Sequence, residues 1–166
     1  MPVSRPGWAL LAAAMLGCAS AAGTAEDPLQ VEVGGADSGG YGFVDWSKPG
    51  VDATIITGPQ GGQHIWVSAR AKLAGPTALD VAVTMYREAT AGQAEALVKP
   101  GTVEILRKSE SQGAWQVLAG VPAFVKEPCK IRNHRVRVEA VVRTNDGKQA
   151  AAKAWITPHY DGYCDP

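Results

Sequence analysis

Histidine is the residue type in this chain best suited to hold a transition metal ion, and the sequence contains three: His64, His134 and His159. No H-x-H, H-E-x-x-H or C-x-x-C pattern connects them. Exported β-sandwich proteins also bind copper through dispersed histidines, so one alternative function is a periplasmic copper- or zinc-binding protein. Histidines without a pattern are more often surface or turn residues, and this favours a protein without a metal site.

The sequence contains no motif that is typical of a catalytic site. No G-x-S-x-G nucleophile motif occurs, and no phosphate loop or G-x-G-x-x-G cofactor motif follows a predicted strand. Three aspartates, Asp37, Asp45 and Asp52, lie in a glycine-rich region, where acidic residues most often serve to form turns. The sequence therefore predicts a non-enzymatic protein without a cofactor.

The stretch from Gly58 to Trp66 is the strongest candidate for recognition. Alternation over residues 63–73 places Ile65 on the core face of a strand and His64 and Trp66 on the opposite face. Exposed aromatic rings commonly stack on sugars or anchor a protein partner. The candidate binding surface therefore consists of Tyr41, Trp46, Gln63, His64 and Trp66. If a loop or a second sheet covers that face, the same residues are packing residues instead, and the sequence leaves both interpretations open.

The N-terminus predicts export. A short apolar run from Trp8 to Gly17 follows Arg5, as in a signal peptide, and it is too short to span a bilayer, which takes about 20 residues. Cys18 comes directly after this run and resembles the lipidated cysteine of a bacterial lipobox. Met15 and Leu16 depart from the usual lipobox residues, and cleavage after Ala21 by an ordinary signal peptidase is the competing hypothesis.

These observations predict a signal peptide over residues 1–17, a tether over 18–28 and one domain over 29–166. The expected location is the outer membrane or periplasm, with lipidated Cys18 as the only membrane attachment, or alternatively the secreted fraction. Cys129 and Cys164 are the remaining cysteines. Because exported proteins meet an oxidising compartment, the sequence predicts a disulfide between these two residues.

Composition excludes a nucleic-acid partner and favours an all-β fold. Basic and acidic residues balance at 16 each, so the chain has no basic excess for phosphate binding. Nineteen glycines and eleven prolines indicate many turns. The expected strands cover residues 29–33, 53–57, 63–73, 79–86, 102–107, 114–118, 135–143 and 150–157, with a helical turn within 91–97 and irregular chain from Pro122 to Pro128.

A resemblance appears at the C-terminal end. The run Val136-Arg-Val-Glu-Ala-Val-Val-Arg-Thr-Asn-Asp-Gly-Lys-Gln-Ala-Ala-Ala is similar to the last two strands of bacterial immunoglobulin-like domains of the PKD and fibronectin type III kind. The resemblance implies an immunoglobulin-like two-sheet antiparallel β-sandwich. The segment Gly58 to Trp66 is also similar to a stretch of uncharacterised bacterial lipoproteins, which implies no activity.

The function expected from the sequence is that of a structural or protein-binding module of the bacterial envelope. Two alternatives stay open: a carbohydrate-binding module that uses exposed aromatic residues, and the copper- or zinc-binding protein. The expected partner is a protein or glycan of the cell envelope.

Overall fold

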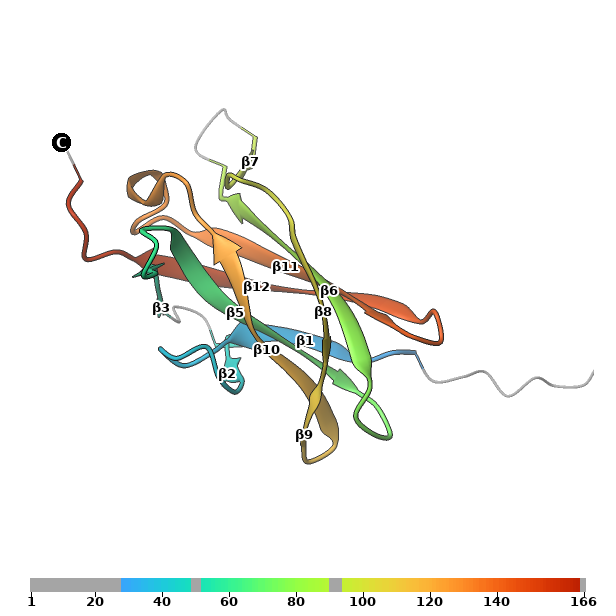
Figure 1. Cartoon of the computed structure of the whole chain (residues 1–166). Helices are drawn as coiled ribbons and strands as arrows, with labels where there is room; N and C mark the ends of the chain where they lie inside the picture. Colours follow the sequence, from blue (N-terminus) through green and yellow to red (C-terminus); the bar gives the residue numbers. More distant parts are fainter. Residues whose placement is uncertain (1–27, 49–51, 90–93, 165–166) are drawn as a thin grey trace, which may run out of the picture.

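The computed structural model of the chain describes residues 28–48, 52–89 and 94–164, and these form two β-sheets packed face to face (Figure 1). The predicted signal peptide, most of the predicted tether and Cys18 lie outside the described residues. The first sheet has the order β2 (Val44–Asp45), β1 (Val31–Gly35), β5 (Gln63–Lys72), β10 (Trp115–Phe124) and β9 (Glu110–Gln112), and β4 (Ile56–Thr57) also pairs with β5. The second sheet has the order β3 (Asp52–Thr54), β12 (Gln149–His159), β11 (Val136–Thr144), β6 (Ala78–Arg87) and β7 (Ala96–Leu97), and β8 (Val103–Lys108) also pairs with β6.

The described part of the chain contains seven strands of five or more residues. Counted along the chain, the first, second and fifth of them (β1, β5 and β10) form one sheet, and the third, sixth and seventh (β6, β11 and β12) form the other. The fourth, β8, pairs with β6 in the second sheet. The predicted antiparallel β-sandwich is therefore confirmed.

Alternating side chains build the core between the sheets. On β5, Val67, Ala69 and Ala71 are fully buried, and on β11 the same is true of Val136 and Val138. A period of two places one face of each strand inward, and burial of that face supplies the hydrophobic stabilisation of the fold. The predicted strands 63–73, 79–86 and 135–143 are confirmed by β5, β6 and β11 within one or two residues.

The irregular stretch predicted from Pro122 to Pro128 is wrong over its first three residues, because β10 continues through Pro122 to Phe124, whereas residues 125–127 form no strand or helix, as predicted. From Leu118 onward β10 pairs only with β5, so its other side is an edge, where proline's missing N–H leaves no ladder bond unmade. The pairing register shifts between Leu118 and Val121, where Gly120 adopts a φ of 66°. This bulge lets one strand be long although its side-chain alternation is interrupted.

Two further predictions differ from the structure. The single strand expected over 53–57 is split: β3 pairs with β12 in the second sheet, and β4 pairs with β5 in the first. Between them, Ile55 is buried and its N–H donates to the carbonyl oxygen of His159 at 2.8 Å. The helical turn expected within 91–97 is not formed by its described residues, because Ala96 and Leu97 form β7; residues 91–93 lie outside the described part.

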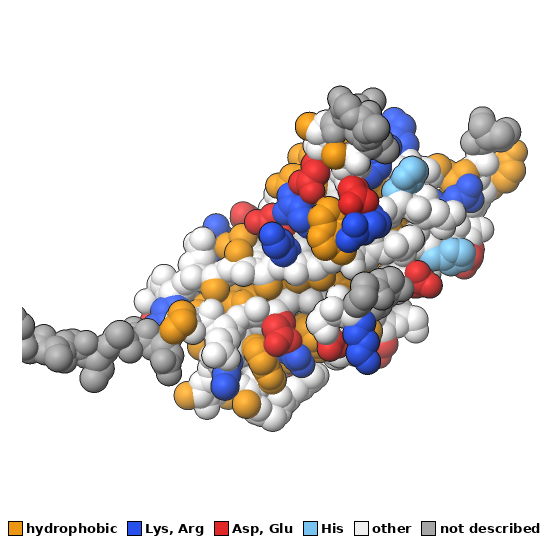
Figure 2. Space-filling view, turned by 180° about the vertical axis from the view of Figure 1, so that it is seen from behind, with side chains coloured by type: hydrophobic (Ala, Val, Ile, Leu, Met, Phe, Trp, Pro, Cys, Tyr) orange, Lys and Arg blue, Asp and Glu red, His pale blue; other side chains and the backbone are white. Residues whose placement is uncertain are grey.

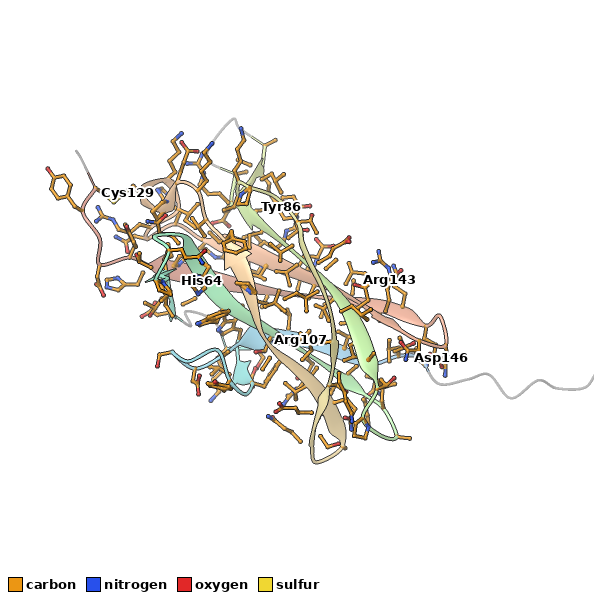
Figure 3. All side chains as sticks on the ribbon, in the orientation of Figure 1. His64, Tyr86, Arg107, Cys129, Arg143 and Asp146 are labelled. Atoms are coloured by element: carbon orange, nitrogen blue, oxygen red, sulfur yellow. A yellow bond between two sulfur atoms is a disulfide. The ribbon has the colours of Figure 1, made fainter. Side chains whose placement is uncertain are left out.

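The C-terminal hairpin has the predicted arrangement. The eight-residue register from Val136↔Ile156 to Arg143↔Gln149 is unbroken, and the turn contains Gly147 at a φ of 83°. Cys129, in the short 3₁₀ turn Pro128–Lys130, is disulfide-bonded to Cys164, with 5.7 Å between the Cα atoms. The predicted disulfide is therefore present, and it fastens the C-terminal segment to the end of the sandwich (Figure 3).

Candidate functional site

The loop of residues 36–43 between β1 and β2 lies over the outer face of the first sheet, and we call it the cover loop. The Ala36 N–H donates to the Trp66 carbonyl oxygen at 3.3 Å, and the Ser68 hydroxyl donates to the Gly42 carbonyl oxygen at 2.8 Å. Asp37 holds the loop's own turn, because its Oδ1 accepts the N–H groups of Gly39 and Tyr41. Ser68, on the outer face of β5, is therefore fully buried.

Glycine allows the cover loop to reach the sheet. Gly40, in the loop, and Gly120, at the β10 bulge, both have positive φ, of 82° and 66°. A Cβ on Gly120 would overlap the carbonyl oxygen of Gly40, and a Cβ on Gly40 would lie 3.1 Å from Cε2 of Trp66. The close approach of the loop to β10 thus requires Gly120, and Gly40 rests against the ring of Trp66.

Trp66 lies under this cover, and His64 lies beside Trp66. The two rings are edge to face with centroids 4.2 Å apart, and Trp66 is half-buried. His64 is only 7 % exposed, and its Nε2 atom has no hydrogen-bond partner among the described residues. Burial lowers the pKa of His64, so the neutral imidazole is the favoured form. The alternation that set these residues opposite Ile65 is confirmed, but the face is largely covered.

Further along the same face of the sheet, the side chain of Arg70 packs against two aromatic rings. The guanidinium of Arg70 lies between two rings, 4.1 Å from the centroid of Phe43 and 4.6 Å from that of Trp115, and its Nε donates to Glu32 at 2.8 Å. Sequence reasoning missed this group. The signal was the position of Arg70 four residues after Trp66 on one strand face, but Phe43 and Trp115 come from distant segments.

Trp46 and Trp66 meet at one hollow, which we call the tryptophan hollow. It has a volume of about 330 Å³ and is lined by Ala36, Asp37, Ser38, Val44, Trp46, Asp52, Ala53, Thr54, Ile56, Ile65 and Trp66. The lining contains two carboxylates, Asp37 and Asp52, and no basic side chain. It combines three segments that are separate in the sequence: the cover loop with β2 and Trp46, the strands β3 and β4, and the start of β5.

The five residues of the predicted binding surface have different surroundings. Tyr41 is 73 % exposed at the tip of the cover loop, and Gln63 is half-buried at the start of β5. Trp46 is only 4 % exposed and belongs to the core, with its ring against Gly35. The expectation that His64 and Trp46 present exposed rings is therefore wrong, because Trp46 packs into the core and His64 is buried beside Trp66, with Phe124 and Gly58 also next to its ring. Only Trp46 and Trp66 of the five line the tryptophan hollow.

The three histidines do not assemble a metal site. In the part of the chain that the structure describes, no group of three or more His, Cys, Asp or Glu side chains is arranged to hold a metal ion. His134 is exposed, and His159 is exposed with its Nε2 2.7 Å from Asp161. In the described residues, the recorded hydrogen bonds join no serine, threonine or cysteine side chain to a histidine.

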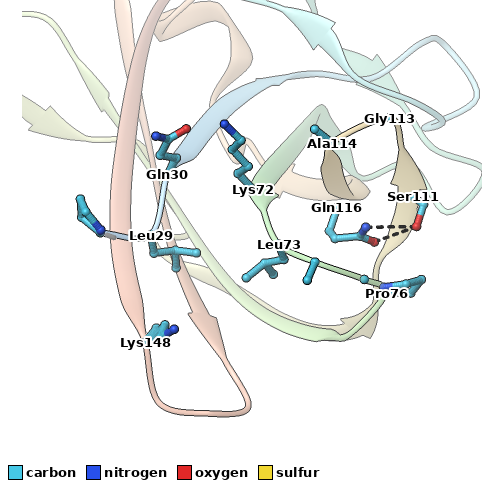
Figure 4. Close-up of a pocket in the computed structure, with 13 residues that line it drawn as sticks. Leu29, Gln30, Lys72, Leu73, Pro76, Ser111, Gly113, Ala114, Gln116 and Lys148 are labelled. Carbon is cyan, nitrogen blue, oxygen red and sulfur yellow. Dashed lines mark hydrogen bonds between the residues drawn. The ribbon is translucent and has the colours of Figure 1, made fainter. Parts of the chain in front are cut away.

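A further hollow contains none of the predicted site residues (Figure 4). Its volume is about 620 Å³, and it lies at the end of the sandwich where the chain enters β1, between Leu29, Leu73 and Gln116. The Gln116 amide already bonds to Ser111 at 3.1 Å, so this buried polar side chain is partnered within the protein. The hollow therefore shows no unsatisfied group that points to a ligand.

Charges on the surface are mixed. Seen from behind, basic and acidic side chains lie next to one another around hydrophobic ones (Figure 2). On the outer face of the second sheet, Arg137 stacks on Tyr86 at 4.3 Å and pairs with Glu95 at 2.7 Å, and this bond lowers the pKa of Glu95. Among the described residues no helix is long and apolar enough to cross a membrane.

Comparison with known proteins identifies no family. No protein-family model matches the chain, and no curated protein matches it. A DUF4466 family protein from Parabacteroides merdae has 15 % sequence identity and a TM-score of 0.31, over 78 % of this chain and 44 % of its own. The N-terminal domain of PorA has 14 % identity and a TM-score of 0.27, over 81 % of this chain and 100 % of its own. The chain spans less than half the length of the first of these.

Proposed function

We propose that this protein is a non-enzymatic module of the bacterial envelope that binds a protein partner through the tryptophan hollow. The observation that supports the proposal is the lining of that hollow: two tryptophans and two carboxylates from separate segments, without a basic residue to neutralise them. Such a lining suits a lysine or arginine side chain of a partner, whose apolar stem contacts Trp66 and Ile56 while its charge meets Asp37 and Asp52.

A protein partner is favoured over a carbohydrate. Sugar binding by aromatic residues needs a ring face that is open to the ligand. Trp46 is 4 % exposed, and Gly40 and His64 both contact the ring of Trp66. The most exposed aromatic side chain of the cover loop is Tyr41, and an isolated exposed tyrosine is a common anchor in protein interfaces.

Attachment to the envelope is part of the proposal. Lipidation at Cys18 would hold the domain at a membrane surface by a short tether, with the disulfide between Cys129 and Cys164 stable in the same oxidising compartment. A sandwich tethered in this way can act by contact with a partner, and this supports a binding role.

Photo-crosslinking in cells tests the proposal. A photoreactive amino acid at Ser38 or at Thr54, both exposed on the rim of the hollow, should form an adduct with one discrete protein. The matched control is the same amino acid at the exposed Glu104 on β8, at the other edge of the second sheet, where no such adduct is expected.

The role of the two carboxylates in binding is tested by replacing each aspartate with asparagine, which removes the charge and keeps the shape of the side chain. In the double variant Asp37→Asn, Asp52→Asn, the amide oxygen introduced at position 37 can still accept the loop's N–H groups, so the fold should be kept and the adduct should fall at least about tenfold, a loss of about 1.4 kcal/mol. Equal adducts at the rim and at Glu104 would contradict the proposal. Binding on a glycan array that the double variant abolishes would replace the protein partner by a carbohydrate.

A further inference from the structure

Strand β8 is an edge of the second sheet. It pairs with β6 from Val103↔Val83 to Lys108↔Ala78, and no described strand pairs with its other side (Figure 1). Residues 94–164 are described without a gap, and the undescribed residues 90–93 connect β6 to β7 rather than to β8. The undescribed N-terminal segment joins β1, which packs against β12, on the far side of β6 and β11 from β8. Among the described residues, this side of β8 is therefore open.

The backbone groups of alternate β8 residues face the open side. The Ser109 N–H donates to the Thr77 carbonyl oxygen at 2.8 Å, so the odd-numbered residues of this segment bond to β6. Because successive residues of a strand direct their N–H and C=O groups to opposite sides, those of Glu104, Leu106 and Lys108 point to the open side. No described backbone group bonds to them there. Strand β8 can therefore pair with one more strand.

Glu104, Leu106 and Lys108 also share the outer face of the sheet. All three side chains are exposed, and Leu106 is 68 % exposed. Glu104 and Lys108 make no ion pair with a described residue. Val103 and Ile105, which alternate with them, pack against the core. The exposed face of this edge thus carries one apolar side chain between an acidic and a basic one.

Arg107 turns inward and bonds to the neighbouring edge of the first sheet. Its Nη2 donates to the carbonyl oxygens of Ala119 and Gly120 on β10, to the second at 3.2 Å. These two carbonyl groups are therefore satisfied within the chain. The side chain of Arg107 also lies away from the outer face that Leu106 occupies, because successive side chains of a strand point to opposite faces.

The order of the charges makes this edge complementary to itself. In an antiparallel pair of two copies about a two-fold axis at Leu106, the two leucines lie opposite each other, and Glu104 of each copy lies opposite Lys108 of the other. Directly opposite side chains of such a pair are in contact, so the opposite charges attract. A register in which Leu106 lies opposite Glu104 or Lys108 loses both ion pairs. The edge therefore favours a second copy in one register.

We propose that β8 is a self-association site, at which two copies of this chain join their second sheets into one continuous antiparallel sheet. The backbone groups of Glu104, Leu106 and Lys108 form the new hydrogen bonds, and the two Glu104–Lys108 pairs fix the register. Because the edge is short, the interface is small and the association is weak and reversible. The site is separate from the tryptophan hollow, whose lining contains no residue of β8.

Sedimentation and hydrogen exchange of the full mature chain test this inference. The chain should form a concentration-dependent dimer in which the amides of Glu104, Leu106 and Lys108 exchange at least about tenfold more slowly than in dilute protein. A chain that stays monomeric at millimolar concentration would overturn the proposal. So would a dimer in which these three amides remain unprotected.

Charge variants test the register. Glu104→Lys and Lys108→Glu each place like charges opposite one another and should weaken the dimer at least about tenfold. Lys153→Glu, the same change at an exposed site on β12, is the matched control and should not. A mixture of the two weakened variants should associate again, because every lysine of one then meets a glutamate of the other. A mixture that stays monomeric would refute the register.

A proline variant tests the backbone pairing. Leu106→Pro removes an N–H that faces the open side, where an edge strand tolerates proline, and should weaken the dimer at least about tenfold. Leu106→Val keeps that N–H and an apolar side chain and should dimerise. Unchanged dimerisation of Leu106→Pro would refute strand pairing. Failure of self-association leaves the proposed function intact, because a crosslink at Glu104 between two copies differs in mass from one with another protein.

Discussion

The contact between the cover loop and β10 gives the sharpest test of how this fold is held. Gly120 and Gly113 both lie on the β9–β10 hairpin at nearly equal φ, 66° and 62°, but a Cβ on Gly120 would overlap the Gly40 carbonyl oxygen, whereas one on Gly113 has no neighbour within 4 Å. Replacing each by alanine therefore puts a Cβ on a residue of positive φ in both variants, and only Gly120→Ala adds a clash.

The expected magnitudes follow from these two effects. The left-handed conformation of alanine costs about 1–2 kcal/mol at either site. Overpacking against the cover loop adds about 1–3 kcal/mol in Gly120→Ala alone. For a chain of this size, a difference of about 2 kcal/mol between the variants corresponds to a melting temperature lower by about 4–8 °C.

Urea denaturation gives the two free energies of unfolding, and hydrogen exchange locates the cause. In Gly120→Ala the Ala36 amide, which donates to the Trp66 carbonyl oxygen, should exchange faster, because the loop must move away from the sheet. In Gly113→Ala the same amide should exchange as in the natural protein. Equal destabilisation of both variants, with the Ala36 amide unaffected in each, would refute the idea that the loop is clamped on β10.

Three further results are expected. The double variant Cys129→Ser, Cys164→Ser should lower the free energy of unfolding by about 4 kcal/mol in the chain-entropy relation, given a sequence separation of 35 residues; titration of two free thiols in protein purified without reductant would contradict the bond. Cys18→Ser should abolish metabolic labelling with a fatty acid, and a soluble mature protein that begins after Cys18 would refute lipidation. Because burial lowers the pKa of His64, the unfolded chain binds more protons, so stability is present above about pH 6.5 and is lost as the pH falls through the folded-state pKa. His64→Gln should flatten this dependence of the unfolding free energy on pH and His134→Gln should not; the natural slope in His64→Gln would show that another group causes it.

Long alternating strands were predictable because their information is local. In β5 and β11, the period of two fixes which side chains face inward without reference to any other segment. The hairpin turn at Asp146 and Gly147 and the pairing of the two late cysteines follow likewise from residue type and short-range chemistry. These features decided the all-β class.

The split of 52–57 between two sheets could not be predicted in that way. One apolar run is compatible with either sheet, and the choice depends on the partners that β3 and β4 find in β12 and β5. The same holds for Pro122, whose place in a strand is acceptable only because β10 has a free side there. Both features depend on pairing between strands that are far apart in the sequence, and no local pattern of residues encodes such pairing.

In the candidate site, too, some features follow from the sequence and others depend on tertiary packing. By itself the sequence determined that Trp66 and His64 face away from Ile65, since successive side chains of a strand point to opposite sides. Only the tertiary structure decided what lies beyond that face, because Gly40 and Gly120 let the cover loop descend onto it and Trp46 turns into the core. Burial depends on which segments meet in space, and a strand's alternation contains no information on what packs against its outer side.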